Sequence, residues 1–245
     1  MTFKNCSFIL LSVLLVNSAC QPEKEKKDPR KMTVTGEIDG LRKGTLYLQK
    51  IVDTLLVNVD STKIDGQPSF NFKTSIATPE VFYLYLDKLD GNSLNDRILF
   101  FGEPGTIEIN TLLKTFESSA KIKGSKNQEL LQEYKSFMRK FDDKNLSLYQ
   151  DFFSAKQQNN GNLSDSIANA MDNLLRRKYL YALNFASQHT DQNIAPYIAI
   201  TEVYDANLSL LDTVADKMTE SVKTSKYGKL FLELLEERHQ NEDDN

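Results

Sequence analysis

The sequence predicts an α+β protein, in which an N-terminal antiparallel β-sandwich or open barrel is followed by a C-terminal α-helical domain. Up to residue 123, apolar residues alternate with polar ones in short segments separated by turn signals, as in half-buried strands. From Ser125 onward they recur at intervals of three and four, which is the period of an amphipathic helix. We therefore expect a β domain over 32–124, a helical domain over 125–240 and a disordered tail at 241–245.

Five segments of the β domain show the alternation of a strand. Residues two apart share one face of a strand, so each segment can bury one face against a second sheet. The segments are 46–48, 57–59, 70–72, 82–86 and 107–109. Turn signals lie at Asp39-Gly40, Asp65-Gly66, Asp90-Gly91 and Pro104-Gly105. Short strands at this spacing are typical of a sandwich or a barrel.

A capping box predicts where the helical domain begins. The side-chain oxygen of Ser125 can accept a hydrogen bond from the backbone of Gln128, while the Gln128 side chain reaches back to the serine. Phe137 follows on the apolar face of this helix, and we expect it at the centre of the helical core. A second helix is expected after Ser164, with others at 195–204, 211–222 and 227–235. We expect the polar chain from Glu236 onward to fray.

The first nineteen residues have the layout of a secretory signal peptide. Lys4 precedes a nine-residue apolar run at 8–16, which is far shorter than the roughly 20 residues of a membrane-spanning helix. The tetrapeptide at 17–20, Asn-Ser-Ala-Cys, resembles a bacterial lipobox. We therefore predict cleavage before Cys20 and attachment of lipid to its thiol, which would hold the protein on a membrane.

Residues 20–31 are expected to be a flexible tether behind this anchor. The stretch 21–31 is polar and charged and contains two prolines, so it cannot bury apolar area. The expected location is the cell envelope, at the outer membrane, and the sequence leaves the periplasmic and surface faces open.

Composition excludes several classes of function. Removing the first nineteen residues takes away one lysine and no acid, so the formal charge moves from −4 to −5, and no basic block suggests a nucleic-acid partner. The two cysteines, Cys6 and Cys20, would be discarded and acylated, which leaves no thiol for redox chemistry or a metal. We identify no catalytic residue and expect no cofactor and no metal. His189, between Ser187 and Asp191, indicates a polar loop between helices, because catalytic triads are assembled from distant positions.

Tyr83 and Tyr85 form the candidate ligand or partner surface. In segment 82–86, Phe82, Leu84 and Leu86 are expected to face the core, which leaves the two tyrosines on the opposite face. Exposed tyrosines two residues apart could bind a sugar or a protein partner, since the ring is apolar and its tip is polar. The alternative is that the helical domain packs over both rings.

The β domain also resembles a known module, the domain of unknown function 4369, found at the N-terminus of many exported Bacteroidetes-type lipoproteins. The resemblance rests on Val34-Thr-Gly36, Gly44, the segment 46–48, Asp60-Ser61, Asp65-Gly66, Phe70, Phe72, the segments 100–105 and 107–109, and Ile122-Lys-Gly124-Ser125. Residues 225–230 look like the connector that follows this module in such proteins. In many relatives the connector leads into a thioredoxin-like domain with a Cys-x-x-Cys centre, which we expect to be lacking here.

Three hypotheses for function follow. The first is a membrane-anchored envelope lipoprotein that acts as a non-enzymatic binding or interaction module. The second, which only the resemblance implies, is the adaptor half of a thiol-disulfide system that works with a separate thioredoxin-like protein in the envelope. The third is an unrecognised carboxylate-dependent hydrolase, which would need two acidic side chains facing each other across a cleft.

Overall fold

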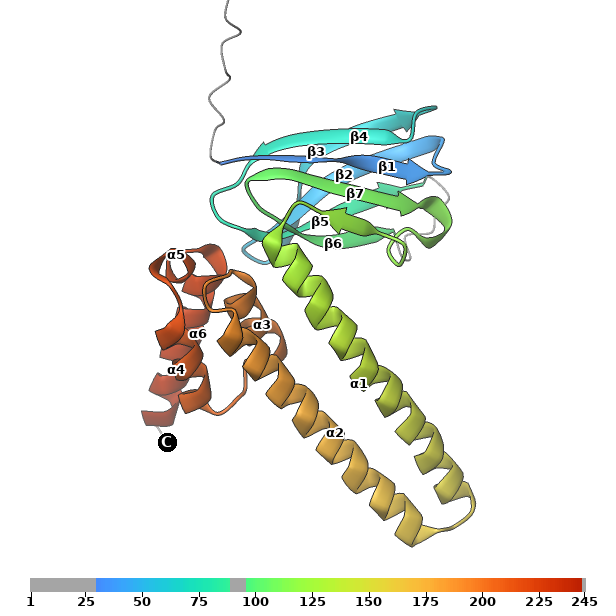
Figure 1. Ribbon diagram of the computed structural model, residues 1–245, viewed down its shortest axis with the longest axis vertical. Helices are drawn as coiled ribbons and strands as arrows, with labels where there is room; N and C mark the ends of the chain where they lie inside the picture. The colour runs from blue at the N-terminus through green and yellow to red at the C-terminus, as the bar shows by residue number, and fades with distance from the viewer. Residues whose placement is uncertain (1–29, 89–95, 244–245) are drawn as a thin grey trace, which may run out of the picture.

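The computed structural model describes residues 30–88 and 96–243, and it confirms the α+β class. Within these residues, eight strands in two four-stranded sheets precede six α-helices. The sheets form a sandwich at one end of the molecule, and the helices extend away from it (Figure 1). The predicted signal peptide, Cys20, most of the predicted tether, the turn expected at Asp90-Gly91 and the last two residues lie outside the described residues.

The two sheets each draw their strands from distant parts of the chain. The first has the order β4-β1-β7-β8 and the second the order β3-β2-β5-β6. The strands are β1 (Lys31–Asp39), β2 (Lys43–Val52), β3 (Leu55–Asp65), β4 (Ser69–Ser75), β5 (Glu80–Asp87), β6 (Arg97–Gly102), β7 (Gly105–Leu112) and β8 (Lys121–Lys123), with a 3-10 turn at Leu113–Thr115. All paired neighbours are antiparallel except β1 and β7, which are parallel. That pair departs from the expected antiparallel pattern because the chain between its strands first builds the whole second sheet, which is a crossover long enough for parallel pairing.

The sandwich core has the composition that the alternation predicted. Phe82, Leu84 and Leu86 of β5 point inward and are buried in one apolar cluster, which confirms the predicted facing of this strand. Tyr83 and Tyr85 lie on its other face and are half-buried. The same cluster takes apolar residues from both sheets, including Val34, Leu46, Phe72, Phe100 and Ile107.

The helices form a long hairpin and a compact group beside its root. They are α1 (Lys126–Gln157), α2 (Gly161–Gln188), α3 (Ile194–Glu202), α4 (Leu208–Lys217), α5 (Glu220–Lys223) and α6 (Lys226–Asp243). The antiparallel pair α1 and α2 projects away from the sandwich, and α3 to α6 pack near the sandwich end of α2 (Figure 1). No helix in the described part of the chain combines the length and apolar character needed to cross a membrane.

The capping box at the start of α1 is half confirmed. Ser125 accepts a 3.0 Å hydrogen bond from the backbone N–H of Gln128, as predicted. The Gln128 side chain does not reach back to the serine, because its Oε1 accepts a 2.8 Å bond from the backbone N–H of Phe101 in β6. The second helix begins earlier than expected, since Asn160 is its N-cap and Ser164 lies within it.

The prediction for Phe137 is wrong. Its side chain is 39% exposed, while Phe101 and Phe231 are fully buried in the helical core. The reason is the geometry of the hairpin, which at this level packs mainly on itself. Phe137 stacks on Tyr181 of α2 across the hairpin, at 5.1 Å between ring centroids.

The C-terminal segment is helical further than its composition suggested, because α6 continues to Asp243. Two of its residues tie its second half to α4 and to the loop before it. Arg238 donates to the backbone oxygens of Tyr204 and Ala206, and His239 lies 3.0 Å from the carboxylate of Asp212.

Candidate binding surfaces

The outer face of the second sheet contributes to the helical core, so the sandwich and the helices are joined by packing. Val81 of β5 and Phe101 of β6 point out of the sandwich and are buried among residues of α1, α2, α3 and α6. The Phe101 ring meets Tyr197 and Tyr227 edge-on, with centroids 5.5 and 5.9 Å away. The sandwich and the helices have separate cores, and β5 and β6 contribute side chains to both, so the helical core extends back across the change from strands to helices at Gly124.

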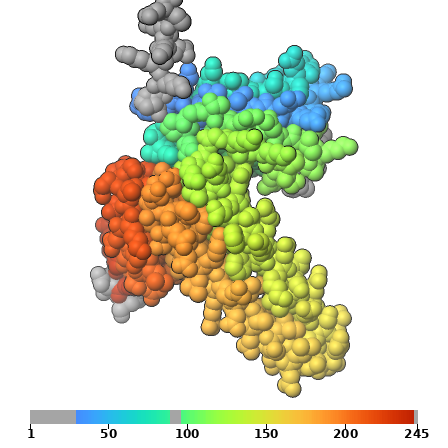
Figure 2. Space-filling model, in the orientation of Figure 1, coloured from blue at the N-terminus to red at the C-terminus, as the bar shows by residue number. Residues whose placement is uncertain are grey.

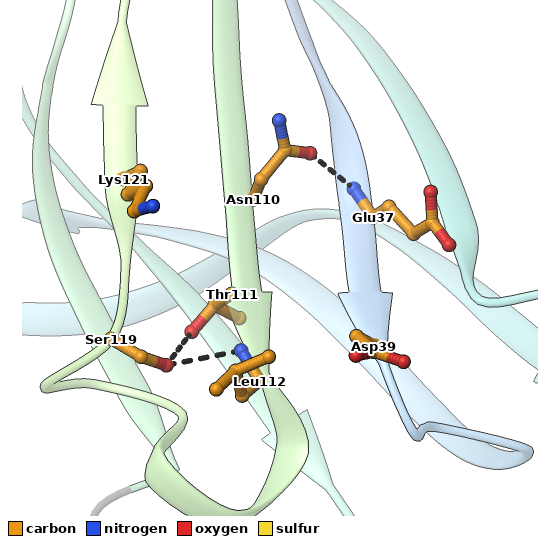
Figure 3. A pocket seen from close by; sticks show the side chains of 7 residues that line it. All are labelled: Glu37, Asp39, Asn110, Thr111, Leu112, Ser119 and Lys121. Atoms are coloured by element: carbon orange, nitrogen blue, oxygen red, sulfur yellow. Dashed lines mark hydrogen bonds between the residues drawn. The ribbon is translucent and has the colours of Figure 1, made fainter.

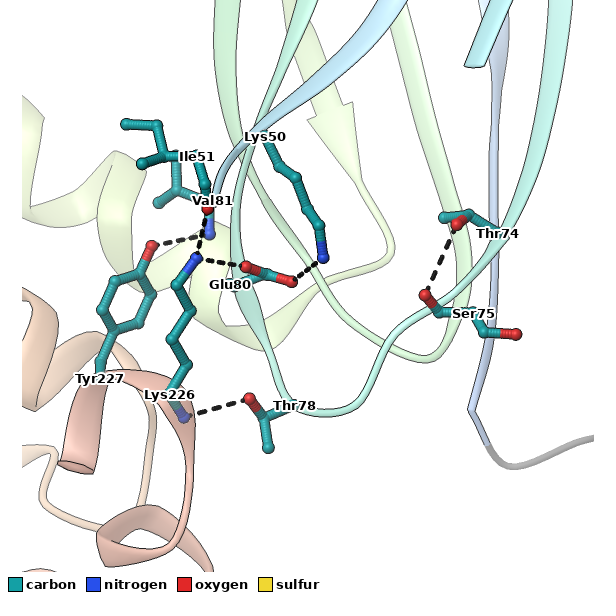
Figure 4. A network of polar contacts seen from close by, with 9 residues as sticks. All are labelled: Lys50, Ile51, Thr74, Ser75, Thr78, Glu80, Val81, Lys226 and Tyr227. Atoms are coloured by element: carbon teal, nitrogen blue, oxygen red, sulfur yellow. Dashed lines mark hydrogen bonds and ion pairs between the residues drawn. The ribbon is translucent and has the colours of Figure 1, made fainter. Parts of the chain in front are cut away.

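A charged network closes one side of this junction (Figure 4). Glu80, at the start of β5, has a side chain only 8% exposed and binds two lysines. Its Oε1 lies 2.9 Å from Lys50 of β2, and its Oε2 lies 2.6 Å from Lys226 of α6. Lys226 also donates a 2.8 Å bond to the backbone oxygen of Ile51. These contacts hold the start of α6 against the second sheet.

Tyr227 adds a neutral contact next to this network. Its hydroxyl accepts a 3.0 Å hydrogen bond from the backbone N–H of Val81, which links α6 to β5. Burial raises the pKa of Tyr227 well above its ordinary value, and burial also raises the pKa of Tyr197 to about 12. The residues of this junction therefore hold the sandwich and the helices together.

The structure separates the two tyrosines that the sequence grouped as a surface. Tyr83 packs against the helical core, whereas the alternative expected the helical domain to pack over both rings. Tyr85 stacks instead on Tyr47 of β2, with ring centroids 5.9 Å apart and an angle of 27° between the rings. A role for either residue in binding stays a prediction.

Tyr85 belongs to a row of side chains that crosses the second sheet. The strand register places Ser61, Tyr47, Tyr85 and Arg97 side by side. The Arg97 guanidinium lies 5.1 Å from the centre of the Tyr85 ring, so Tyr47 and Arg97 both lie against that ring. Tyr47 could have been found from the sequence, because the alternation at 46–48 directs it outward just as it directs Tyr85.

A polar hollow of about 470 Å³ lies on the outer face of the first sheet (Figure 3). Its lining comes from β1, β7, β8 and the loop before β8, and consists of Glu37, Asp39, Asn110, Thr111, Leu112, Ser119 and Lys121. Several of its polar groups bond to each other. The Asn110 side chain accepts from the Glu37 backbone at 3.0 Å, and Ser119 bonds both the Thr111 hydroxyl and the Leu112 backbone. The side chains of Asn110, Thr111 and Ser119 are therefore satisfied by bonds within the protein.

The outer half of the helical hairpin carries large apolar side chains in contact with water. Leu146, Tyr149 and Phe153 of α1 are 60%, 46% and 64% exposed, and Leu175 of α2 is 64% exposed. The spacing of four and three places the first three on one face of α1. Beside Leu175, a shallow apolar hollow of about 350 Å³ is lined by Leu175, Arg176, Tyr179 and Leu180. In Figure 2 the tip of this hairpin stands free of the sandwich and of the other helices.

These four residues lie on the same side of the hairpin. Asp142 lies one turn before Leu146 on the same face of α1, and it lines a groove between the two helices together with Leu175 and Lys178. Lys178 and Asp142 form an ion pair across this groove at 2.8 Å. We call the surface made by Leu146, Tyr149, Phe153 and Leu175 the hairpin face. The sequence alone does not reveal this face, because a 3–4 apolar spacing looks the same whether a face is buried or exposed.

The remaining candidate residues from the sequence are not assembled into a reactive site. Ser187 accepts a bond from Lys217, Asp191 accepts one from Gln192, and the His189 ring packs on Phe185. Among the described residues, no hydrogen bond joins Ser187, His189 and Asp191. Within the same ranges, no three His, Cys, Asp or Glu side chains gather closely enough to hold a metal ion.

Comparison with known proteins finds a family match for the first part of the chain alone. Residues 32–131 match the family model described as Domain of unknown function (DUF4369). The matched part covers the eight strands, apart from the first residue of β1, and the first turns of α1. No curated protein and no solved structure matches the chain.

Proposed function

We propose that this protein is a membrane-anchored envelope lipoprotein whose folded part is a non-enzymatic module that binds a protein partner through the hairpin face. The observation that carries the proposal is the exposure of Leu146, Tyr149, Phe153 and Leu175 at the end of a projecting arm. A contiguous apolar patch on a monomer is characteristic of an interaction site. Its two aromatic residues are also of the kind that dominate binding energy in interfaces.

The shape of the molecule supports the same proposal. The described chain enters the sandwich at Lys31, and the turn between α1 and α2 lies at the other end of the long axis (Figure 1). With 32 residues, α1 is about 48 Å long. An anchor on Cys20 would hold the sandwich near the membrane, and the hairpin face would then be presented well away from it.

In-cell crosslinking tests this function. A photo-crosslinking residue replaces Phe153 in the full chain, and mass spectrometry identifies what it captures. Ser147, exposed on another side of α1, provides the matched control position. We expect a reproducible protein partner from position 153, none from position 147, and loss of the partner when Cys20→Ala releases the chain from the membrane. Equal capture from both positions, or none from either, would contradict the proposal.

A further inference from the structure

We propose that the partner of the hairpin face is a second copy of this chain, so that two hairpins pack face to face into a four-helix bundle. This inference rests on the proposed function and names the partner. It follows from the spacing, the area and the charges of the hairpin face, all of which suit self-association.

The spacing of residues on the hairpin face is that of a helical bundle. On α1 the positions 142, 146, 149, 153 and 156 follow each other at intervals of four and three, and on α2 the positions 165, 168, 172, 175 and 179 do the same. A 3–4 alternation keeps a seam on one side of a helix and allows side chains to interlock with those of a facing helix. The inner seam between α1 and α2 is already filled within the hairpin, for example by Tyr134, Phe141 and Tyr181. On the outer seams Leu146, Tyr149, Phe153 and Leu175 stay exposed, whereas Asp142 pairs with Lys178 and Tyr179 packs against the helical core.

The area is of the size that a small two-fold interface requires. Large side chains bury about 150–250 Å² each, so the four residues of the hairpin face leave about 400 Å² of apolar surface exposed per copy. Two such patches and their polar rims reach about 1,000 Å², which is the lower limit for a specific interface. A two-fold interface also brings the same surface from each copy, so a single patch is sufficient.

The charges select one arrangement of the two hairpins. The Asp142–Lys178 ion pair sets the level of the helices within a hairpin. Fourteen residues from this pair toward the tip, α1 has reached Lys156 and α2 is at Ser164. Lys156 therefore lies level with Ser164 and next to Asp165. Near the root of the hairpin α1 thus carries an acid, Asp142, and α2 carries bases, whereas near the tip α1 carries Lys156 and α2 carries an acid.

A two-fold axis parallel to the hairpins makes these charges complementary. It places α1 of each copy over α2 of the other at the same level, with the two tips side by side. Asp142 then faces Arg176 of the second copy, and Lys156 faces Asp165. Leu146 faces Leu175, and the large ring of Phe153 lies over the small side chain of Ala168. All four charged side chains are exposed in the single chain, and Asp142 already pairs with Lys178 of its own hairpin, so Arg176 of the second copy would join an existing ion pair.

Co-isolation of two differently tagged full-length copies from detergent-solubilised membranes tests the arrangement. We expect the wild-type copies to co-isolate, and Leu146→Glu or Phe153→Glu to lower recovery at least about tenfold. Leu163→Glu is the matched control, since Leu163 is 45% exposed but lies about 120° around α2 from Leu175. Each variant's thermal unfolding is compared with that of the wild type, so that loss of fold is not read as loss of pairing.

A charge reversal tests the register. Lys156→Glu and Asp165→Lys should each weaken co-isolation, because like charges then face each other, and the double variant should restore it. Failure of wild-type copies to co-isolate, an equal loss with Leu163→Glu, or no recovery in the double variant would overturn the proposal. If the copies do not pair but Phe153-dependent capture of another envelope protein persists, only the identity of the partner is wrong. If neither occurs, the proposed function fails as well.

Discussion

Glu80 and Lys226 lie 146 residues apart in the chain and meet with 2.6 Å between Oε2 and Nζ, at the place where the second sheet touches the last helix. The carboxylate is almost fully buried, and its other oxygen binds Lys50. One carboxylate therefore serves as the counter-charge of two lysines at the junction between sandwich and helices (Figure 4). Because both lysines are about 30% exposed, water screens each ion pair and weakens the attraction between its charges.

Replacing this acid should loosen the junction. Glu80→Gln keeps the shape of the side chain but leaves two lysines without a counter-charge, and we expect it to lower the free energy of unfolding by about 2–3 kcal/mol. The control is Glu129→Gln, which breaks the exposed pair with Lys126 and should cost less than about 1 kcal/mol. Denaturant titration measures both. Equal losses would show that the buried network contributes no more than a surface ion pair.

The helical core should depend on Phe101, although this residue belongs to a strand. Phe101→Ala removes a fully buried ring from contact with Tyr197 and Tyr227, so we expect a loss of about 3–5 kcal/mol. Phe137→Ala removes a ring that is 39% exposed and should cost about 1–2 kcal/mol. Denaturant titration compares the two variants, and a loss with Phe137→Ala as large as that with Phe101→Ala would show that the core is not centred on Phe101.

The sequence was sufficient for the local facing of residues and insufficient for their long-range partners. Alternation correctly directed Phe82 inward and Tyr83 outward, and the capping serine correctly marked the start of α1. Such patterns depend on residues a few positions apart. Whether Phe137 is buried depends instead on where α3 to α6 pack, and a single apolar stripe carries no information about that.

The same limit applies to the candidate surfaces. Tyr83 and Tyr85 share a face of one strand, but the helices reach only one of them, because they pack over one end of the sheet. Tyr47 joined Tyr85 through strand pairing, which the sequence of one strand does not specify. The exposed hairpin face could be recognised only once the length of α1 and α2 beyond the other helices was known.

A glycine in the last helix should be irreplaceable. A Cβ on Gly228 would lie 1.9 Å from the backbone oxygen of Val222, and backbone cannot move aside cheaply. We expect Gly228→Ala to separate α5 from α6 and to lower the free energy of unfolding by more than about 3 kcal/mol.

Gly161→Ala is the matched control for this change. Gly161 begins α2, and a Cβ there meets nothing within 4 Å. Alanine also restricts the unfolded chain, so this variant should be neutral or up to about 1 kcal/mol more stable. Thermal and denaturant unfolding of both variants checks the pair, and a well-tolerated Gly228→Ala would mean that α5 and α6 pack less closely than described.

Alkaline pH should weaken the junction through its buried tyrosines. An unfolded chain releases a tyrosine proton near pH 10, whereas burial raises the pKa of Tyr197 to about 12 in the folded protein and raises that of Tyr227 as well. Between these values the folded state binds more protons than the unfolded state, so the free energy of unfolding should fall as pH rises above 10. Below pH 10 both states are protonated and this effect vanishes.

Tyr197→Phe should remove about 2 kcal/mol of the loss in the free energy of unfolding seen at pH 12. Tyr149→Phe removes a hydroxyl at an exposed site and is the control for loss of the hydroxyl alone. Urea titrations at stepped pH measure the slope, and a curve that Tyr197→Phe leaves unchanged would show that this tyrosine ionises equally easily in both states.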